Sequence, residues 1–174
     1  SEGLTKQEIS FIRSKGVKLL PIYNSFQGAK GYHQGKAAAN DAVLNALKLE
    51  IPRGVPLFAN IERFFQIDEE WIQGWTGALV TSGYRSGIYN DPVEGGFNKA
   101  FCNAVKENET VKIRNILWSA QPELPPSGPR NPPDYKPKAP DCGGNVCVWQ
   151  YSRKVTPCPI DTNLAHSNLV NILW

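Results

Sequence analysis

The sequence predicts an α/β protein whose parallel strands form a (β/α) barrel of the TIM type. The first observation is a repeating order, in which a helical pattern and a short apolar strand alternate several times along the chain. Alternation of this kind gives parallel β-α-β units with right-handed crossovers, which leaves two main architectures, a doubly wound sheet and a closed barrel. The second observation is that no glycine-rich phosphate-binding loop follows any strand, which counts against a nucleotide-binding sheet and favours the barrel.

The number of strands falls short of a complete barrel. Five strands are expected, over residues 17–23, 55–62, 84–90, 113–120 and 146–152. A full barrel needs eight strands and typically about 250 residues. The 174 residues are therefore expected to form a single domain, residues 1–174, that lacks the first one or two strands of the barrel. Because the chain starts at Ser1 and contains no Met, we also expect a processed chain or an excised piece.

Helices are expected between these strands, over residues 5–16, 35–49, 68–82 and 97–105, with a short final helix over residues 163–173. Thr5 and Glu8 have the spacing of a capping box at the start of the first helix. Asp68 is expected to cap the third helix and Gly83 to end it. The alternation of helices and strands is interrupted between Pro122 and Pro140, where eight of the fourteen prolines lie. Proline cannot donate a backbone hydrogen bond, so residues 122–140 are expected to form a loop or extended arm.

Composition narrows the classes of partner. The net charge of +3 is mild and the basic residues are scattered, so nucleic acid is not expected as a partner, whereas approach to an anionic surface is favoured. No apolar run reaches the ~18 residues of a membrane-spanning helix. No cofactor-binding motif is visible.

The four cysteines, Cys102, Cys142, Cys147 and Cys158, leave three chemical states open. An even number suits one or two disulfides in an oxidising compartment, and four cysteines allow three pairings. A zinc site near His166 is the second reading, but the spacing from Cys142 to Cys147 is at the edge of that of a knuckle, and no second knuckle follows. Buried thiols are the third. Disulfides are favoured, and no metal ligands are assigned.

Function is expected at the carboxyl ends of the strands, where barrel enzymes carry their catalytic groups. Besides the acids Glu62 and Asp91, the strand ends carry mostly aromatic and amide side chains: Tyr23, Asn90, Trp118, Gln121, Gln150 and Tyr151. Sugars offer apolar ring faces and many hydroxyl groups, so aromatic surfaces and amide hydrogen-bond donors suit them.

Glu62 is the strongest candidate for a catalytic group. Alternation along residues 55–62 places Phe58, Asn60 and Glu62 on one face of the strand. If Phe58 faces into the barrel, Glu62 lies at the top of the same inner column. Partial burial favours the neutral form of a carboxyl group, which is the form that a general acid needs. A glutamate that only caps the next turn, or pairs with an arginine, fits the spacing equally well.

Glycoside hydrolysis usually needs a second carboxylate, and Asp91 and Asp161 are the candidates. Asp91 follows a strand end, but Asp-Pro also opens ordinary turns, and we favour the turn. Asp161 precedes a possible helix start, where an N-cap is an equally natural role. The spacing leaves the role of Asp161 open.

The ordered set of strand ends resembles a known family. It includes Pro21-Ile22-Tyr23, Ile61-Glu62, Ser82-Gly83-Tyr84-Arg85-Ser86-Gly87-Ile88-Tyr89, Leu117-Trp118-Ser119-Ala120-Gln121 and Trp149-Gln150-Tyr151 followed by Ile160-Asp161. This series is similar to the glycoside-hydrolase-like barrel domains long catalogued as a domain of unknown function, and more remotely to family-25 lysozymes. The resemblance covers almost the whole chain.

The resemblance implies a glycan ligand, with peptidoglycan favoured, and a secreted or cell-surface setting. It places Glu62 at the family's acidic strand end and Asp161 at the aspartate after the late Trp-Gln-Tyr strand. The sequence departs from the pattern at Asn60, where lysozyme-like relatives have an aspartate, and in lacking an initial acidic strand. An amide cannot act as a base or nucleophile.

Three functions therefore remain. The first is a glycan hydrolase with Glu62 as general acid and Asp161, or an acid upstream of Ser1, as its partner; the ligand-binding residues would then be Tyr23, Asn60, Tyr89, Asp91, Trp118, Gln121 and Gln150. The second is a glycan-binding module without catalysis, which Asn60 favours. The third is a structural component of a surface assembly, attached to a protein partner through the proline-rich arm. We favour the first.

Overall fold

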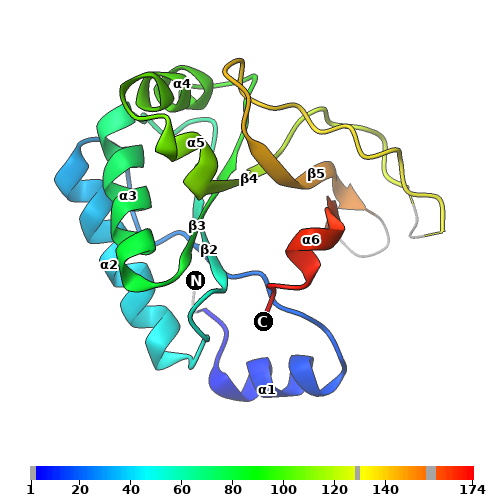
Figure 1. Cartoon of the computed structure of the whole chain (residues 1–174). Helices are drawn as coiled ribbons and strands as arrows, with labels where there is room; N and C mark the ends of the chain where they lie inside the picture. The colour runs from blue at the N-terminus through cyan, green and yellow to red at the C-terminus, as the bar shows by residue number, and fades with distance from the viewer. Residues whose placement is uncertain (1–2, 128–129, 156–159) are drawn as a thin grey trace.

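A computed structural model describes the protein at residues 3–127, 130–155 and 160–174. The protein is built on one six-stranded sheet, and Figure 1 shows helices α2 and α3 side by side along one side of it. The strands lie in the order of the chain: β1 (Ile22–Tyr23), β2 (Pro56–Asn60), β3 (Arg85–Asn90), β4 (Asn115–Ser119), β5 (Asn145–Val155) and β6 (Ile160–Ala165). Strands β1 to β5 pair in parallel, whereas β6 pairs with β5 in the antiparallel sense. The protein is thus of the α/β class, with a mixed sheet.

The prediction of a TIM-type barrel is wrong, because the sheet is an open half-barrel. Closure needs enough tilted strands to bring the last beside the first, and five parallel strands are too few. The chain instead turns back after β5, so that β6 forms one edge of the sheet and β1 the other. In place of the missing wall, the carboxyl-terminal tail runs beside the segment before β1, where Leu19 and Trp174 exchange two backbone hydrogen bonds of 2.7 and 3.2 Å.

The helices follow the expected order with two differences. They are α1 (Lys6–Ser14), α2 (Tyr32–Lys48), α3 (Glu69–Ser82), α4 (Phe97–Glu107), α5 (Thr110–Arg114) and α6 (Ser167–Val170). The capping box of Thr5 and Glu8, the Asp68 cap and the Gly83 end are all confirmed. The short helix α5 replaces the start of an expected strand, and β6 replaces the start of the expected final helix.

The larger part of the core lies between the sheet and helices α2 to α5, on what we call the outer face. Leu57, Ala59 and Ile61 of β2 and the segment after it point there, against Trp71 and Trp75 of α3. Helices α2 and α3 touch through glycines: a Cβ atom at Gly35 would lie 2.1 Å from the carbonyl oxygen of Trp71, and one at Gly74 would lie 2.2 Å from that of Tyr32. Larger side chains at these two positions would force the helices apart.

The opposite, inner face carries a smaller cluster, which packs under α6. Its buried members are Phe58, Ile116, Val148 and Leu169. Phe58 therefore faces away from Leu57 and Ala59, as alternation predicts. Gly87 of β3 leaves room for the Phe58 ring, since a Cβ atom there would lie 2.7 Å from it. Phe58 is thus fixed in the middle of the inner face, below the strand ends.

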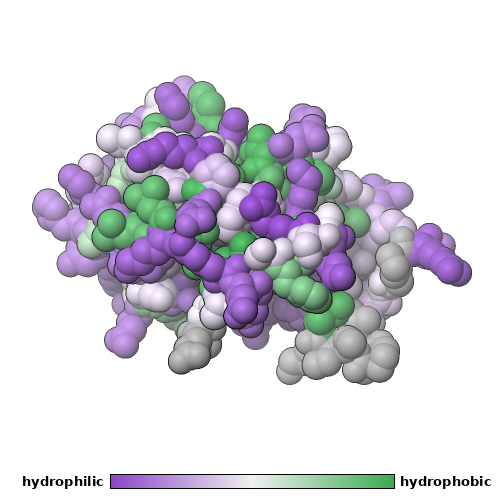
Figure 2. All heavy atoms as spheres, turned by 90° about the horizontal axis from the view of Figure 1, so that it is seen from below, coloured by the Kyte–Doolittle hydropathy of each residue, from purple (hydrophilic) through white to green (hydrophobic). Residues whose placement is uncertain are grey.

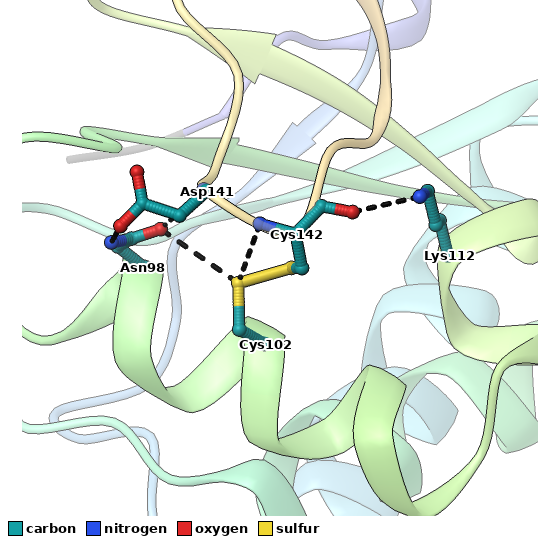
Figure 3. The surroundings of a disulfide bond; sticks show 5 residues. All are labelled: Asn98, Cys102, Lys112, Asp141 and Cys142. Carbon is teal, nitrogen blue, oxygen red and sulfur yellow. Dashed lines mark hydrogen bonds between the residues drawn. A yellow bond between two sulfur atoms is a disulfide. The ribbon is translucent and has the colours of Figure 1, made fainter.

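The proline-rich arm, residues 122–140, contains no helix or strand in its described part. It is held against β5 rather than projecting freely: the Leu124 N–H donates to the Tyr151 carbonyl (2.6 Å), the Trp149 indole donates to the Pro122 carbonyl (3.0 Å), and the Tyr135 hydroxyl donates to the Val146 carbonyl (3.0 Å). Beyond the arm, a disulfide joins Cys142 to Cys102 of α4 (Figure 3). Next to it, Lys112 donates a 2.7 Å hydrogen bond to the Cys142 carbonyl.

The disulfide decides between the states predicted for two of the cysteines. Cys102 and Cys142 are paired, so neither is free to bind zinc. Cys147 is a half-buried free thiol, and Cys158 lies outside the described residues.

Seen from the side of α1, hydrophilic atoms cover most of the surface, and apolar atoms form separate patches (Figure 2). No helix in the described part of the chain is long and apolar enough to cross a membrane.

We expect the disulfide to stabilise the fold substantially, because it closes a loop with a sequence separation of 40. Replacing both cysteines (Cys102→Ser with Cys142→Ser) should lower the free energy of unfolding by about 3–4 kcal/mol, through the greater entropy of the uncrosslinked unfolded chain. Urea unfolding measures the change. Cys147→Ser is the matched control, since this thiol is unpaired, and it should change the free energy by much less. Equal stability of the double variant and wild type would contradict the expectation.

Candidate functional site

Six of the predicted site residues come together at the carboxyl end of the inner face. They are Asn60, Glu62, Tyr89, Trp118, Gln150 and Asp161, from β2, β3, β4, β5 and β6 and the segment just after β2. Strand β2 ends at Asn60, and Glu62 lies two residues beyond. Glu62 is half-buried, and its Oε1 accepts a 3.3 Å hydrogen bond from the Asn60 amide. Asn60 thus holds the Glu62 carboxylate in place.

The aromatic floor of this site is the half-buried ring of Trp118, which rests on the buried rings of Phe58 and Tyr89. The Trp118 ring meets the Phe58 ring edge-on, with centroids 5.7 Å apart, and meets the Tyr89 ring edge-on at 5.4 Å. Such geometry is favourable because ring edges are positive and ring faces are negative. The Trp118 indole also donates a 2.9 Å hydrogen bond to Oδ1 of Asn163 on β6. The Trp118 side chain therefore contacts residues of β2, β3 and β6.

The Tyr89 hydroxyl is influenced by three charged groups of the site. Burial raises the pKa of Tyr89, the Arg153 charge lowers it, and the charges of Glu62 and Asp161 raise it. A 3.3 Å hydrogen bond from the Arg153 guanidinium to the Tyr89 oxygen also lowers this pKa. Arg153 therefore contacts the Tyr89 oxygen directly, while the carboxylates of Glu62 and Asp161 act on this hydroxyl through their charges.

Asp161 reaches the site through the antiparallel hairpin of β5 and β6. Its Oδ2 accepts a 2.8 Å hydrogen bond from the Gln150 amide, so a β5 side chain orients it. Arg153, also on β5, lies 3.6 Å from the Glu123 carboxylate of the arm. The arm therefore borders the site through an ion pair with a residue that contacts Tyr89.

Arg153 and Asn163 are members of the site that the sequence did not predict. Simple alternation from Gln150 gives Ser152, and not Arg153, as the next residue on the inner face. The register between β5 and β6 shifts between Gln150 and Ser152 and again before Val155, and such irregularities re-aim side chains. Asn163 lies in β6, where a helix was expected. No sequence signal marks these register shifts.

Three predicted residues are placed elsewhere. Asp91 is buried and caps a turn: its Oδ1 accepts hydrogen bonds of 2.9 Å from the N–H groups of Val93 and Glu94. Its Oδ2 accepts a 3.0 Å hydrogen bond from the Gln121 amide, so the two side chains are engaged with each other. Tyr23 lies on the outer face, where its ring stacks on Trp75 and its hydroxyl donates to Asp41. Burial, and after it the Asp41 hydrogen bond, raise the pKa of Tyr23.

The arrangement can perform acid and base chemistry on a ligand that lies over the aromatic floor. Two carboxylates supply a proton donor and a proton acceptor, and Asn60, Gln150 and Asn163 supply amide groups. Within the described ranges, no three His, Cys, Asp or Glu side chains are grouped closely enough to hold a metal ion. The site is thus composed as a sugar site would be, with acids, amides and aromatic rings.

An open β/α half-barrel with carboxylates at its strand ends is what a glycoside hydrolase-like domain would have. The family model of the Rv2525c-like, glycoside hydrolase-like domain matches residues 1–126, and the chain belongs to this family. The predicted likeness to glycoside-hydrolase-like domains is confirmed, while the remoter likeness to family-25 lysozymes stays a prediction.

A solved structure resembles the chain over its whole length. Its title is "1.07 A crystal structure of an uncharacterized B. stearothermophilus protein". The two sequences are 48% identical, and the match includes 100% of this chain and 82% of the other, with a TM-score of 0.97. No curated protein matches the chain. The half-barrel is therefore shared with a natural relative.

We expect Arg153→Gln to raise the pKa of Tyr89 further. The guanidinium lowers this pKa through its charge and its hydrogen bond, so the tyrosinate loses its stabilising neighbour when the charge is removed. Alkaline titration followed by tyrosinate absorbance, with Tyr89→Phe to identify the Tyr89 component, measures the shift. Arg13→Gln is the control, because this arginine lies over the Trp174 ring instead. An unchanged or lowered pKa in Arg153→Gln would show that Arg153 does not act on Tyr89.

Proposed function

We propose that the protein is a glycoside hydrolase that acts on an extracellular glycan, with the peptidoglycan of a cell wall as the favoured substrate. The observation that carries the proposal is that two carboxylates lie at the carboxyl end of the inner face, Glu62 held by the Asn60 amide and Asp161 held by the Gln150 amide, on strands that also carry Tyr89 and Trp118. Glycosidases commonly use two carboxylates that flank the bond to be broken. Membership of a glycoside hydrolase-like family supports a glycan-related role.

In this proposal Glu62 is the general acid, which protonates the oxygen of the leaving sugar. It is half-buried, and the Asn60 amide fixes its orientation. Asp161, oriented by Gln150, is the second carboxylate and serves as base or nucleophile on the other side of the bond. The Tyr89 hydroxyl, whose raised pKa keeps it protonated, donates a hydrogen bond to the substrate between them.

The setting proposed is secreted or cell-surface. A disulfide suits an oxidising compartment, and the charge of +3 favours approach to an anionic wall. The disulfide ties Cys142, which lies just beyond the arm, to Cys102 of α4 (Figure 3). A protein partner on the exposed residues of the arm remains part of the proposal, although several arm residues already pack against β5.

A second candidate function is glycan binding without hydrolysis. Asn60 favours it, because an amide occupies the strand end where lysozyme-like relatives are expected to have an aspartate, and its hydrogen bond ties up one oxygen of Glu62. Asp161 likewise already accepts a hydrogen bond from Gln150. The aromatic floor would bind sugar equally well in either case.

Glu62→Gln separates the two functions. If Glu62 is the general acid, the variant should lose at least about 100-fold of the rate at which purified peptidoglycan is cleared, because an amide cannot donate the proton. Binding to insoluble peptidoglycan should remain close to that of wild type, since the shape of the side chain is kept. Turbidity loss and co-sedimentation are the two measurements.

The control is Glu107→Gln on α4, a glutamate that bonds to Gln73 away from the site. It should clear peptidoglycan at the wild-type rate. Clearing by Glu62→Gln at the wild-type rate would remove Glu62 from the catalytic role. Binding by wild type and variant with no clearing by either would establish the binding module instead.

A further inference from the structure

A depression lies at the carboxyl end of the sheet, on the outer-face side of β1 and β2. It is a cavity of about 840 Å³ between the 23–30 segment, α2 and the 64–66 segment. This volume is in the range of sites that hold small molecules. Tyr23, which the sequence placed in the site of Glu62, lines this cavity instead.

The wall of the cavity combines aromatic and polar side chains. The Phe64 ring lies against that of Phe65 with centroids 5.1 Å apart, yet Phe64 is 75% exposed. Gln34 and Asp41, from one side of α2, add an amide and a carboxylate, and Lys30 adds one positive charge. An exposed aromatic ring beside convergent polar groups is the composition expected where a sugar ring stacks and its hydroxyl groups form hydrogen bonds.

The charges favour a neutral occupant. Among the lining residues Lys30 and Asp41 carry opposite charges, so the cavity has no net charge with which to select an anion or a cation. The Asp41 carboxylate is also engaged by the Tyr23 hydroxyl and by Asn45. A neutral sugar unit suits this lining, because the cavity has no excess of charge of either sign.

One short turn connects the cavity with the candidate catalytic site. The Phe65 N–H donates a 2.9 Å hydrogen bond to the Glu62 carbonyl, so Glu62 and the two phenylalanines belong to the same turn. Three residues of chain span at most about 10 Å. The cavity is therefore within reach of a short oligosaccharide whose other end lies beside Glu62.

We propose that this cavity, with Phe64 as its stacking surface and Gln34 as a hydrogen-bonding group, binds a neutral sugar unit of the same glycan chain that the Glu62 site processes. The identity of the glycan rests on the proposed function, whereas the cavity is a site separate from that of Glu62. It adds affinity for a long glycan without taking part in the cleavage step.

The test is binding to purified peptidoglycan, measured as the fraction of protein that sediments with increasing amounts of the polymer. Phe64→Ala should weaken binding about 3- to 10-fold through the loss of one stacking surface, and Gln34→Ala should weaken it in the same direction. Phe64→Tyr, which keeps the ring, should bind like wild type. Phe11→Ala on α1 is the matched control, since it also removes an exposed phenylalanine (64% exposed) and should leave binding unchanged.

The outcomes separate this proposal from the proposed hydrolysis. Weaker binding by Phe64→Ala supports the cavity even if wild type clears no peptidoglycan, in which case hydrolysis fails alone. Wild-type binding by both Phe64→Ala and Gln34→Ala overturns the cavity, whether or not Glu62→Gln stops clearing. An equal loss in Phe11→Ala also overturns it, because general surface stickiness would then explain the effect. Absence of binding by wild type overturns the cavity, while clearing of peptidoglycan by wild type still decides the proposed hydrolysis separately.

Discussion

The antiparallel pairing of β6 with β5 is the interaction on which the rest of the structure depends. Five parallel strands cannot close into a barrel, and the edge beyond β5 would be left open to pair with other chains. The hairpin occupies that edge and returns the chain across the inner face. In doing so it brings Asp161 beside Gln150, aligns Asn163 with Trp118, and allows α6 to cover Phe58. The candidate site and the stability of the half-barrel thus have a common cause.

Much of the layout could be predicted from the sequence because local rules govern it. The capping box of Thr5 and Glu8, the Asp68 cap and the alternation of Phe58 against Leu57 depend on residues a few positions apart, and each is confirmed. The failure of closure depends instead on which strands pair at the end of the chain. Residues 160–165 form a strand because β5 offers an edge, a non-local effect that outweighs their weak local preference.

The site was predicted in part for the same reason. Asn60, Tyr89 and Trp118 lie on parallel strands and Glu62 follows β2 closely, so the strand-end rule applies directly. The strand-end rule does not hold for Tyr23, because β1 is only two residues long and the Tyr23 side chain points toward α2 and α3. There its hydroxyl donates a hydrogen bond to Asp41 and its ring stacks on Trp75. Arg153 was missed because the register shifts in β5 reverse the side that it faces. The side that Arg153 faces could not be predicted from the sequence, because it depends on the irregular backbone of β5 and not on residue type.

The account's central claim is that Glu62 and Asp161 work on one glycosidic bond, and a crystal structure of the Glu62→Gln variant with a peptidoglycan fragment tests it most directly. The account predicts a sugar ring over Trp118, with the glycosidic oxygen between residue 62 and Asp161 and their carboxyl-type carbons about 5–10 Å apart, the range that glycosidases use. A fragment bound away from the inner face, or a separation well beyond that range, would contradict the claim.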